Sequence, residues 1–242
     1  MLKQISLLIL CAVAIVLFAT PVHACTSAVV SGKVTLDGRP LLWKNRDTDF
    51  MRNHVDYVKG ERYDFIAVVN SANAYLKEAW MGTNSAGFAL MNTQSYNLVD
   101  VKGDEERGAA NGRVIYRALE VCATVEDFCH FLDTISKPSD IEANFGVIDA
   151  QGGAAMFEVD YYKYVMYDAN NPKDAPYGYI ARTNFSFAGK VNEGAGYVRY
   201  MEADQVLMKA SATGNITPQF IFNDLSRSFR NRMLDIDLRS GV

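Results

Sequence analysis

Short stretches rich in apolar residues, separated by polar and turn-forming residues, mark the chain from residue 26 to about residue 93. Residues 26–32 predict one strand and residues 41–45 a second. The Asp-Gly-Arg-Pro turn at 37–40 predicts that these two strands form a hairpin. Further strands are expected at 63–70, 76–81 and 87–93. This part of the chain is therefore predicted to be mostly β-structure.

Beyond the polar loop at 100–111, apolar residues recur at the spacing of a helix. Apolar residues at positions 114, 115, 118, 119 and 122 share one helical face. Thr124 followed by Asp127 resembles a capping box, which predicts that a second helix begins there and covers 125–135. Pro138 ends this segment, because proline cannot continue a helix.

The second half of the chain repeats the order of strands followed by helices. Strands are expected at 144–150, 154–160, 161–167 and 179–183, the first two forming a hairpin. Helices are expected at 197–209 and from the N-cap Thr217 to about residue 230. This order predicts an α+β fold of two packed sheets flanked by helices, rather than a doubly wound parallel sheet.

The C-terminal residues suggest a further strand. Residues 234–238 alternate between apolar and acidic side chains, and the sequence stops at Val242 without a closing element. Truncation of the C-terminal strands is therefore an open alternative.

The first 24 residues have the features of a secretory signal peptide. Lys3 lies in a short leading segment, residues 7–19 are all apolar, and Pro21 is followed by Val22 and Ala24 at the −3 and −1 positions of a cleavage site. An uncleaved anchor is the rival interpretation, but the apolar run is short for a membrane span. We therefore predict an exported protein, periplasmic or secreted, with residues 25–242 as one mature domain.

Length, composition and charge narrow the class of protein. The 242 residues, 49% of them hydrophobic, suit one compact domain with a substantial core. A net charge of −4 gives no electrostatic reason to expect nucleic acid as a partner. Only His54 and His130 follow the leader, and no metal-binding spacing of Cys or His occurs, so no metal or cofactor is expected. The sequence does not indicate an oligomeric state.

The cysteines single out one residue. Cys11 lies in the leader, and Cys122 and Cys129 are either bridged across a break between helices or two buried thiols. On one continuous helix their Cα atoms would be about 10.5 Å apart, too far for a disulfide. Cys25 is left over in either case, directly after the expected cleavage site. An odd cysteine in an exported protein indicates a reactive thiol or a site of covalent attachment.

A cysteine at the first position of a mature chain carries a nucleophile and a base on one residue. The thiol of Cys25 can attack a carbonyl carbon, and its own α-amine, with a reference pKa of about 7.7–8.0, can accept the thiol proton. Such a site needs no histidine. It does need donors for the developing oxyanion, for which asparagines on neighbouring strands are candidates. Asp47, at the end of the second strand, is expected to return beside Cys25 and hold its amine.

Four stretches then appear in a characteristic order: Cys25-Thr26-Ser27, Trp43 to Asp47, Gly82 to Asn92, and Arg182-Thr183-Asn184. Together they resemble the cysteine N-terminal-nucleophile (Ntn) hydrolases. This group includes acyl-CoA:6-aminopenicillanic-acid acyltransferase, penicillin V acylase, bile salt hydrolase and acid ceramidase. The resemblance implies an αββα sandwich and the cleavage or exchange of a non-peptide amide bond.

The resemblance also implies roles for individual residues. Asn92 corresponds to the asparagine that helps to form the oxyanion hole, and Asn184 to the one that positions substrate and nucleophile. Both are expected to stabilise the tetrahedral oxyanion. Arg199 is assigned to a second arginine of the family, late in the chain. Lys44 and Asn45 are expected to bind substrate. Lys44 stands where bile salt hydrolases carry arginine, so the charge is retained but the bidentate fork is lost.

The sequence thus predicts an exported amidohydrolase or acyltransferase that acts on a small N-acyl amide through an acyl-enzyme on Cys25. Catalytic roles fall to Cys25, Asp47, Asn92, Asn184 and Arg199. The alternative is a lipid-anchored binding or scaffolding protein in which Cys25 carries the lipid. A papain-like protease is a weaker option, because the Cys-Gly-Ser-Cys surroundings and a suitable downstream histidine are missing.

Overall fold

The computed structural model describes residues 25–72, 74–99, 108–228 and 230–237. The predicted signal peptide, residues 1–24, lies outside the described residues. The described chain forms two large antiparallel sheets and a short two-stranded pairing within residues 230–237, with helices inserted between strands and after them.

The larger sheet has seven strands in chain order, each antiparallel to its neighbours. Helices α2 (Asn111–Val121) and α3 (Val125–Thr134) lie between the fourth and fifth strands in sequence. The strands are β3 (Asn53–Val58), β4 (Phe65–Asn70), β5 (Met81–Asn84), β6 (Ala89–Gln94), β7 (Ala143–Ile148), β8 (Ala154–Val159) and β9 (Tyr164–Asp168).

The smaller sheet has three strands, with the first strand of the chain at its centre. β1 (Thr26–Val30) pairs with β2 (Leu41–Asn45) on one side and with β10 (Tyr179–Arg182) on the other, both antiparallel. Every residue of β1 is buried, because the sheet is covered on both faces. The remaining elements are η1 (Gly32–Val34), η2 (Ala74–Leu76), α4 (Tyr197–Ser211), α5 (Pro218–Phe220), the π-helical turn η3 (Ile221–Leu225), β11 (Arg230–Asn231) and β12 (Ile236–Asp237).

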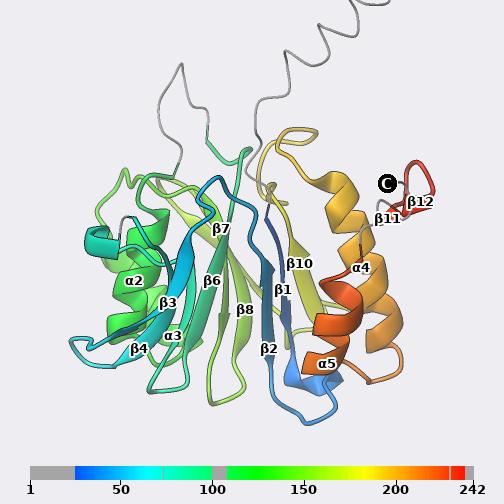
Figure 1. The fold of residues 1–242 in the computed structure, drawn as a ribbon, viewed down its shortest axis with the longest axis horizontal. Coiled ribbons are helices and arrows are strands. Elements are labelled where there is room, and N and C mark those ends of the chain that lie inside the picture. The colour runs from blue at the N-terminus through cyan, green and yellow to red at the C-terminus, as the bar shows by residue number, and fades with distance from the viewer. Residues whose placement is uncertain (1–24, 73, 100–107, 229, 238–242) are drawn as a thin grey trace, which may run out of the picture.

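Three hydrophobic clusters join these elements into four layers. One cluster, centred on Phe128, lies between the larger sheet and α2 and α3. A second, which includes Val30 and Leu207, lies between the smaller sheet and α4. The third, which includes Val29 and Met156, lies between the two sheets. Figure 1 shows the layers side by side as helix, sheet, sheet, helix. The predicted αββα sandwich is confirmed.

The strand and helix predictions hold in most places, with three exceptions. β3 was not predicted, because it is an edge strand with polar residues that pairs only with β4. The strand expected at 76–81 begins only at Met81, since the Ala79 N–H donates to Gly112 O, at the start of α2, at 3.0 Å. The last helix ends at Leu225 instead of residue 230. The next residue, Ser226, accepts a hydrogen bond through Oγ from Trp43 Nε1 of β2 at 2.9 Å.

The structure confirms the predicted capping box and decides between a disulfide and two free thiols for Cys122 and Cys129. Thr124 Oγ1 accepts from the Asp127 N–H, while the Asp127 carboxylate accepts from the Thr124 N–H. Cys122 is a buried free thiol and Cys129 a half-buried one, so the two are not bridged. The alternation at 234–238 yields a two-residue pairing between β11 and β12.

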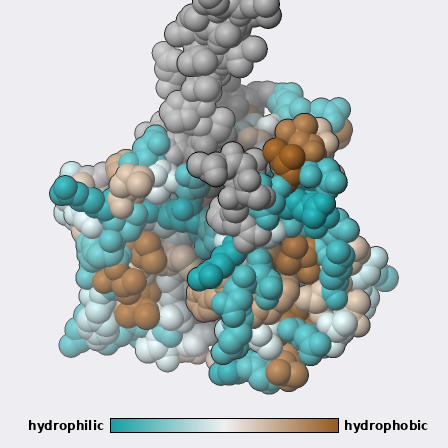
Figure 2. All heavy atoms as spheres, turned by 45° about the vertical axis from the view of Figure 1, so that its right-hand side comes forward, coloured by the Kyte–Doolittle hydropathy of each residue, from teal (hydrophilic) through white to brown (hydrophobic). Residues whose placement is uncertain are grey.

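Within the described ranges, no helix has both the length and the apolar character that a bilayer crossing needs. On the face that Figure 2 shows, hydrophobic side chains form separate patches among hydrophilic ones.

The contact between the sheets gives a test of the fold. A methyl group on Gly146 of β7 would meet the Met91 side chain and would lie 2.8 Å from Val29 Cγ2. Gly146→Ala should therefore lower the free energy of unfolding, measured by urea denaturation, by about 1–3 kcal/mol. A Met91→Ala background removes the nearest of these contacts but leaves those with Val29 and Leu42, so the cost of the added methyl group should shrink without vanishing. An unchanged stability of the single variant would contradict this packing.

Candidate active site

Cys25 lies immediately before β1, at a cavity between elements of both sheets. Its relative exposure is only 9%. The cavity measures about 680 Å³, within the range of about 300–1,000 Å³ that is usual for small-molecule sites. Its polar lining residues include Cys25, Lys44, Arg46, Asp47, Asn92 and Gln94.

Asn184 and Arg199 both contact the main chain of Cys25. The Cys25 nitrogen donates to Asn184 Oδ1 at 2.9 Å. Arg199 Nη1 donates to the Cys25 carbonyl oxygen and to Thr26 Oγ1, and Nη2 donates to Asn184 Oδ1 at 2.9 Å. Burial lowers the pKa of Arg199, while charge on Cys25 and Asp47 opposes that shift. The late arginine assigned from the sequence is thus in direct contact with Cys25.

The other end of the Asn184 carboxamide is also engaged. Asn184 Nδ2 donates to the main-chain oxygen of Gln94, the last residue of β6, at 2.8 Å. Since Oδ1 accepts from Cys25 and Nδ2 donates to Gln94, Asn184 is arranged to hold the Cys25 nitrogen. This arrangement does not fit the predicted donation by Asn184 to an oxyanion.

A glycine lets Arg199 approach the site. Gly196, the N-cap of α4, has φ of 89°, a conformation that side chains disfavour. A Cβ atom there would also lie 2.5 Å from Arg199 Nη2 and 2.9 Å from Thr183 Cβ. The chain can therefore turn into α4 at this point, close to Asn184, only because residue 196 is glycine.

Lys44 fixes the orientation of Asn92. Lys44 Nζ donates to Asn92 Oδ1 at 3.0 Å and to Trp80 O at 2.9 Å. Because the lysine holds the oxygen of the amide, the Asn92 NH₂ group is the end that remains to serve as a donor. Burial lowers the pKa of Lys44 to about 8, against the opposing effect of charge on Cys25.

Asp47 and Asn45 differ from their predicted arrangements. The contact between Cys25 Sγ and Asp47, at 3.9 Å, is to the main-chain oxygen of Asp47 rather than to its carboxylate. Asn45 Nδ2 donates to Ser226 O at 3.4 Å, on the same side of β2 as Trp43. Successive side chains of a strand point to opposite faces, so Asn45 lies on the far side from Lys44. Asn45 is not among the residues that line the cavity, and its binding of substrate stays a prediction.

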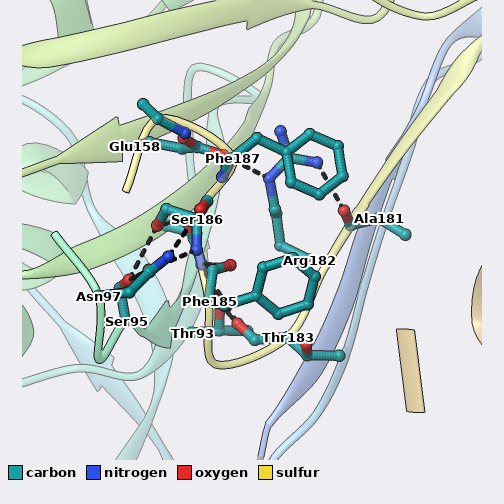
Figure 3. Close-up of polar contacts among 12 residues, drawn as sticks. Thr93, Ser95, Asn97, Glu158, Ala181, Arg182, Thr183, Phe185, Ser186 and Phe187 are labelled. Atoms are coloured by element: carbon teal, nitrogen blue, oxygen red, sulfur yellow. Dashed lines mark hydrogen bonds and ion pairs between the residues drawn. The ribbon is translucent and has the colours of Figure 1, made fainter. Parts of the chain in front are cut away.

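A buried ion pair supports the loop that carries Asn184. Arg182 Nε donates to Glu158 Oε1 at 2.6 Å, and both side chains are almost inaccessible. The N–H groups of Phe187 and Ala188 donate to the same carboxylate at 2.9 and 2.7 Å. Figure 3 shows the Arg182 guanidinium between Glu158 and the Phe187 ring. The loop is thereby tied to β8 of the larger sheet.

Asn144 of β7 holds the same loop from beneath. Its Nδ2 lies 3.2 Å from the main-chain oxygens of both Thr183 and Phe185, and its Oδ1 accepts from Ser186 Oγ at 2.6 Å. Ser186 also bonds Ser95 beyond the end of β6 (Figure 3). Residues on both sides of Asn184 are consequently fixed to the larger sheet.

Gln94 and Arg46 are among the cavity residues that the sequence did not indicate. Gln94 contributes a main-chain oxygen, which leaves no signal in a side-chain pattern. Arg46 lines the cavity and could have been found from the strand alternation, which places it on the same side as Lys44.

Most of the chain matches one known protein family. Residues 35–220 match the family model for acyl-coenzyme A:6-aminopenicillanic acid acyl-transferase. This range covers most of the chain. The chain belongs to the acyl-coenzyme A:6-aminopenicillanic acid acyl-transferase family. No curated protein matches it. The matched range includes the predicted site residues Lys44, Asp47, Asn92, Asn184 and Arg199 and begins after Cys25, so the assignment of Cys25 rests on the geometry.

Solved structures resemble this family member at low sequence identity, and the first of those given below shares its fold. An N-acylethanolamine-hydrolyzing acid amidase orthologue from Caenorhabditis elegans has a TM-score of 0.55 and 15% identity, covering 83% of this chain and 89% of its own. A conjugated bile acid hydrolase mutant from Clostridium perfringens has a TM-score of 0.49 and 15% identity, with coverages of 89% and 76%. A penicillin V acylase from Agrobacterium tumefaciens has a TM-score of 0.43 and 16% identity, covering 85% of this chain and 64% of its own.

The family match and the fold confirm the resemblance drawn from the sequence. The chain is an enzyme of the Ntn amide hydrolase or acyltransferase type.

Thiol reactivity tests the environment of Cys25. In Lys44→Gln the cation that favours a thiolate is lost, so alkylation of Cys25 by iodoacetamide near neutral pH should slow by about threefold to tenfold. Cys122 is an internal control, because burial raises its pKa to about 12 and it should stay unmodified. Peptide mass spectrometry measures each site separately. Equal rates in both proteins would contradict the electrostatic link.

Proposed function

We propose that this protein is an N-terminal-nucleophile enzyme that cleaves or exchanges the amide bond of a small N-acyl compound, with Cys25 as nucleophile. The observation that carries the proposal is the convergence on Cys25. Asn184 accepts from its nitrogen, Arg199 binds its carbonyl oxygen, and Lys44 and Asn92 line the cavity beside its thiol.

The related structures support the substrate class. By name, they hydrolyse N-acylethanolamines, conjugated bile acids and penicillin V. The family itself is named for transfer to 6-aminopenicillanic acid. A small N-acyl amide is the class that these compounds share, with either water or a second amine as acyl acceptor.

Maturation by removal of residues 1–24 is part of the proposal. In the unprocessed chain the Cys25 nitrogen is a peptide nitrogen that cannot accept a proton. Cleavage after Ala24 would turn it into an α-amine with a pKa of about 7.7–8.0 in the reference state. The signal-like leader supports export to the periplasm or the medium, where this cleavage occurs.

The proposed reaction proceeds through a thioester. The Cys25 thiol gives its proton to the α-amine, and the sulfur attacks the acyl carbon. The tetrahedral intermediate collapses as the ammonium returns a proton to the leaving nitrogen, the C–N bond breaks, and the free amine departs. Water or an acceptor amine then attacks the thioester, gives up a proton to the α-amine, and releases the acyl product and the thiol.

The surrounding residues take separate parts in this reaction. Asn184 holds the Cys25 nitrogen through Oδ1, so that the amine lone pair can face the thiol. Asn92, oriented by Lys44, supplies an NH₂ donor for the oxyanion. The Asp47 carboxylate acts on Arg199 through charge, and Arg199 fixes the main chain of Cys25.

Replacement of the nucleophile tests the mechanism. Cys25→Ser should lower the rate of hydrolysis of a panel of N-acyl amides by at least about 100-fold, because a hydroxyl is a far poorer nucleophile than a thiol near neutral pH. The circular dichroism spectrum should stay unchanged. Cys129→Ser, at a half-buried thiol outside the cavity, is the matched control and should keep full activity. Undiminished turnover by Cys25→Ser would refute the mechanism.

The mass of the exported protein tests maturation. A chain that begins with an unmodified Cys25 agrees with the proposed enzyme. An added diacylglyceryl group would instead establish the lipid-anchored alternative. A different first residue, or a blocked nitrogen, would remove the proposed base.

The pH dependence of kcat/KM tests Lys44. Activity should rise as the α-amine loses its proton and fall above about pH 8, because Lys44 then loses its charge. Arginine stays charged, so Lys44→Arg should hold its activity to about pH 9 or beyond. Lys33→Arg, outside the cavity, should leave the profile unchanged. An unaltered alkaline limb in Lys44→Arg would assign that limb to another group.

A further inference from the structure

Arg46 is a cation in the proposed active site that the mechanism does not use. It follows β2 directly and lines the cavity together with Cys25 and Lys44. The centre of its guanidinium lies 4.9 Å from the centroid of the Trp80 ring.

Neutral side chains hold Arg46 in place. Nη2 donates to Asn70 Oδ1 at 2.8 Å, and Nη1 donates to Asn53 Oδ1. Asn53 and Asn70 face each other in the register of β3 and β4, so they form a clamp at the end of this strand pair. A guanidinium has five N–H donors, and among the described residues these two asparagines take two of them.

No carboxylate of the described residues neutralises the guanidinium charge of Arg46. The arginines Arg113, Arg117 and Arg182 each have a glutamate partner. Among the described residues, no carboxylate forms an ion pair with Arg46 or Lys44. Asp47 lines the cavity but pairs with neither of them, and its charge acts on Arg199. Burial lowers the pKa of Arg46, and charge on Cys25 opposes that shift.

We infer that Arg46 determines specificity by binding a carboxylate of the substrate. This inference rests on the proposed function. The planar fork of a guanidinium matches a carboxylate in two parallel hydrogen bonds, and the asparagine clamp and Trp80 hold that fork before substrate arrives. The substrate class is therefore an N-acyl amide that carries a carboxylate near the amide bond, on either the acyl or the amine part.

The rival role for Arg46 is stabilisation of the Cys25 thiolate. A cation that acts only on the thiolate would aid neutral and anionic substrates equally. A cation that binds the substrate carboxylate would aid the anionic ones alone. Two substrates that differ by one charge separate these roles.

The experiment compares kcat/KM within matched pairs. For a carboxylate on the amine part, the pair is an N-acylglycine and its N-acylglycinamide. For one on the acyl part, the pair is an N-substituted succinamic acid and its methyl ester. The parent protein should favour the charged member of at least one pair by about tenfold or more. In Arg46→Gln this ratio should fall to about one, and Arg46→Lys should retain part of it.

Arg62→Gln is the matched control, because Arg62 also lies over an aromatic ring, that of Tyr63, but does not line the cavity. It should keep the parent ratio. The inference is wrong if the parent protein favours the charged member of neither pair. It is also wrong if Arg46→Gln slows both members equally, or if Arg62→Gln loses the preference as well.

A binding measurement separates this inference from the proposed function. The N-acylglycine should protect Cys25 from iodoacetamide at a concentration at least about tenfold lower than the glycinamide does. Arg46→Gln should remove that difference. Protection of this kind without turnover would refute the amidase function and uphold the carboxylate site, whereas turnover of neutral substrates with no charge preference would do the reverse.

Discussion

The carboxamide of Asn184 is the contact on which the arrangement of the site depends. Its oxygen accepts from the Cys25 nitrogen and from Arg199, and its nitrogen donates to Gln94 O. These partners come from the start of the smaller sheet, from α4 and from the larger sheet. One amide thereby sets the position of the nucleophile relative to β6, the strand that contributes Asn92 and Gln94 to the cavity wall.

The support beneath Asn184 explains how a loop can hold such a contact. Burying Arg182 and Glu158 costs solvation energy, and this cost is offset only where the remaining donors and acceptors are also satisfied. The loop N–H groups of Phe187 and Ala188 complete the Glu158 carboxylate. Asn144 engages the loop carbonyls from the other side. The polar network therefore fixes a conformation that apolar packing alone would leave undefined.

The proposed site divides its charges into two groups with different partners. Arg182 is neutralised inside the protein, whereas Lys44 and Arg46 face the cavity on neutral acceptors. A cavity wall of this kind favours negative charge, first on the thiolate and then on the bound molecule. The proposed chemistry and the proposed substrate preference thus arise from one electrostatic feature, since both depend on cations that form no ion pair within the described part of the chain.

The sequence by itself determined the αββα order of elements, the family, and most of the residues around Cys25, because periodicity and short motifs are local properties. It placed Asn45 in the site instead of Arg46, although strand alternation puts Arg46 on the side of Lys44. Only the tertiary structure decided that Asn184 holds a nitrogen, that Asp47 presents its main-chain oxygen to the thiol, and that Gln94 takes part. Those contacts join segments up to 159 residues apart, and main-chain groups carry no mark in a sequence.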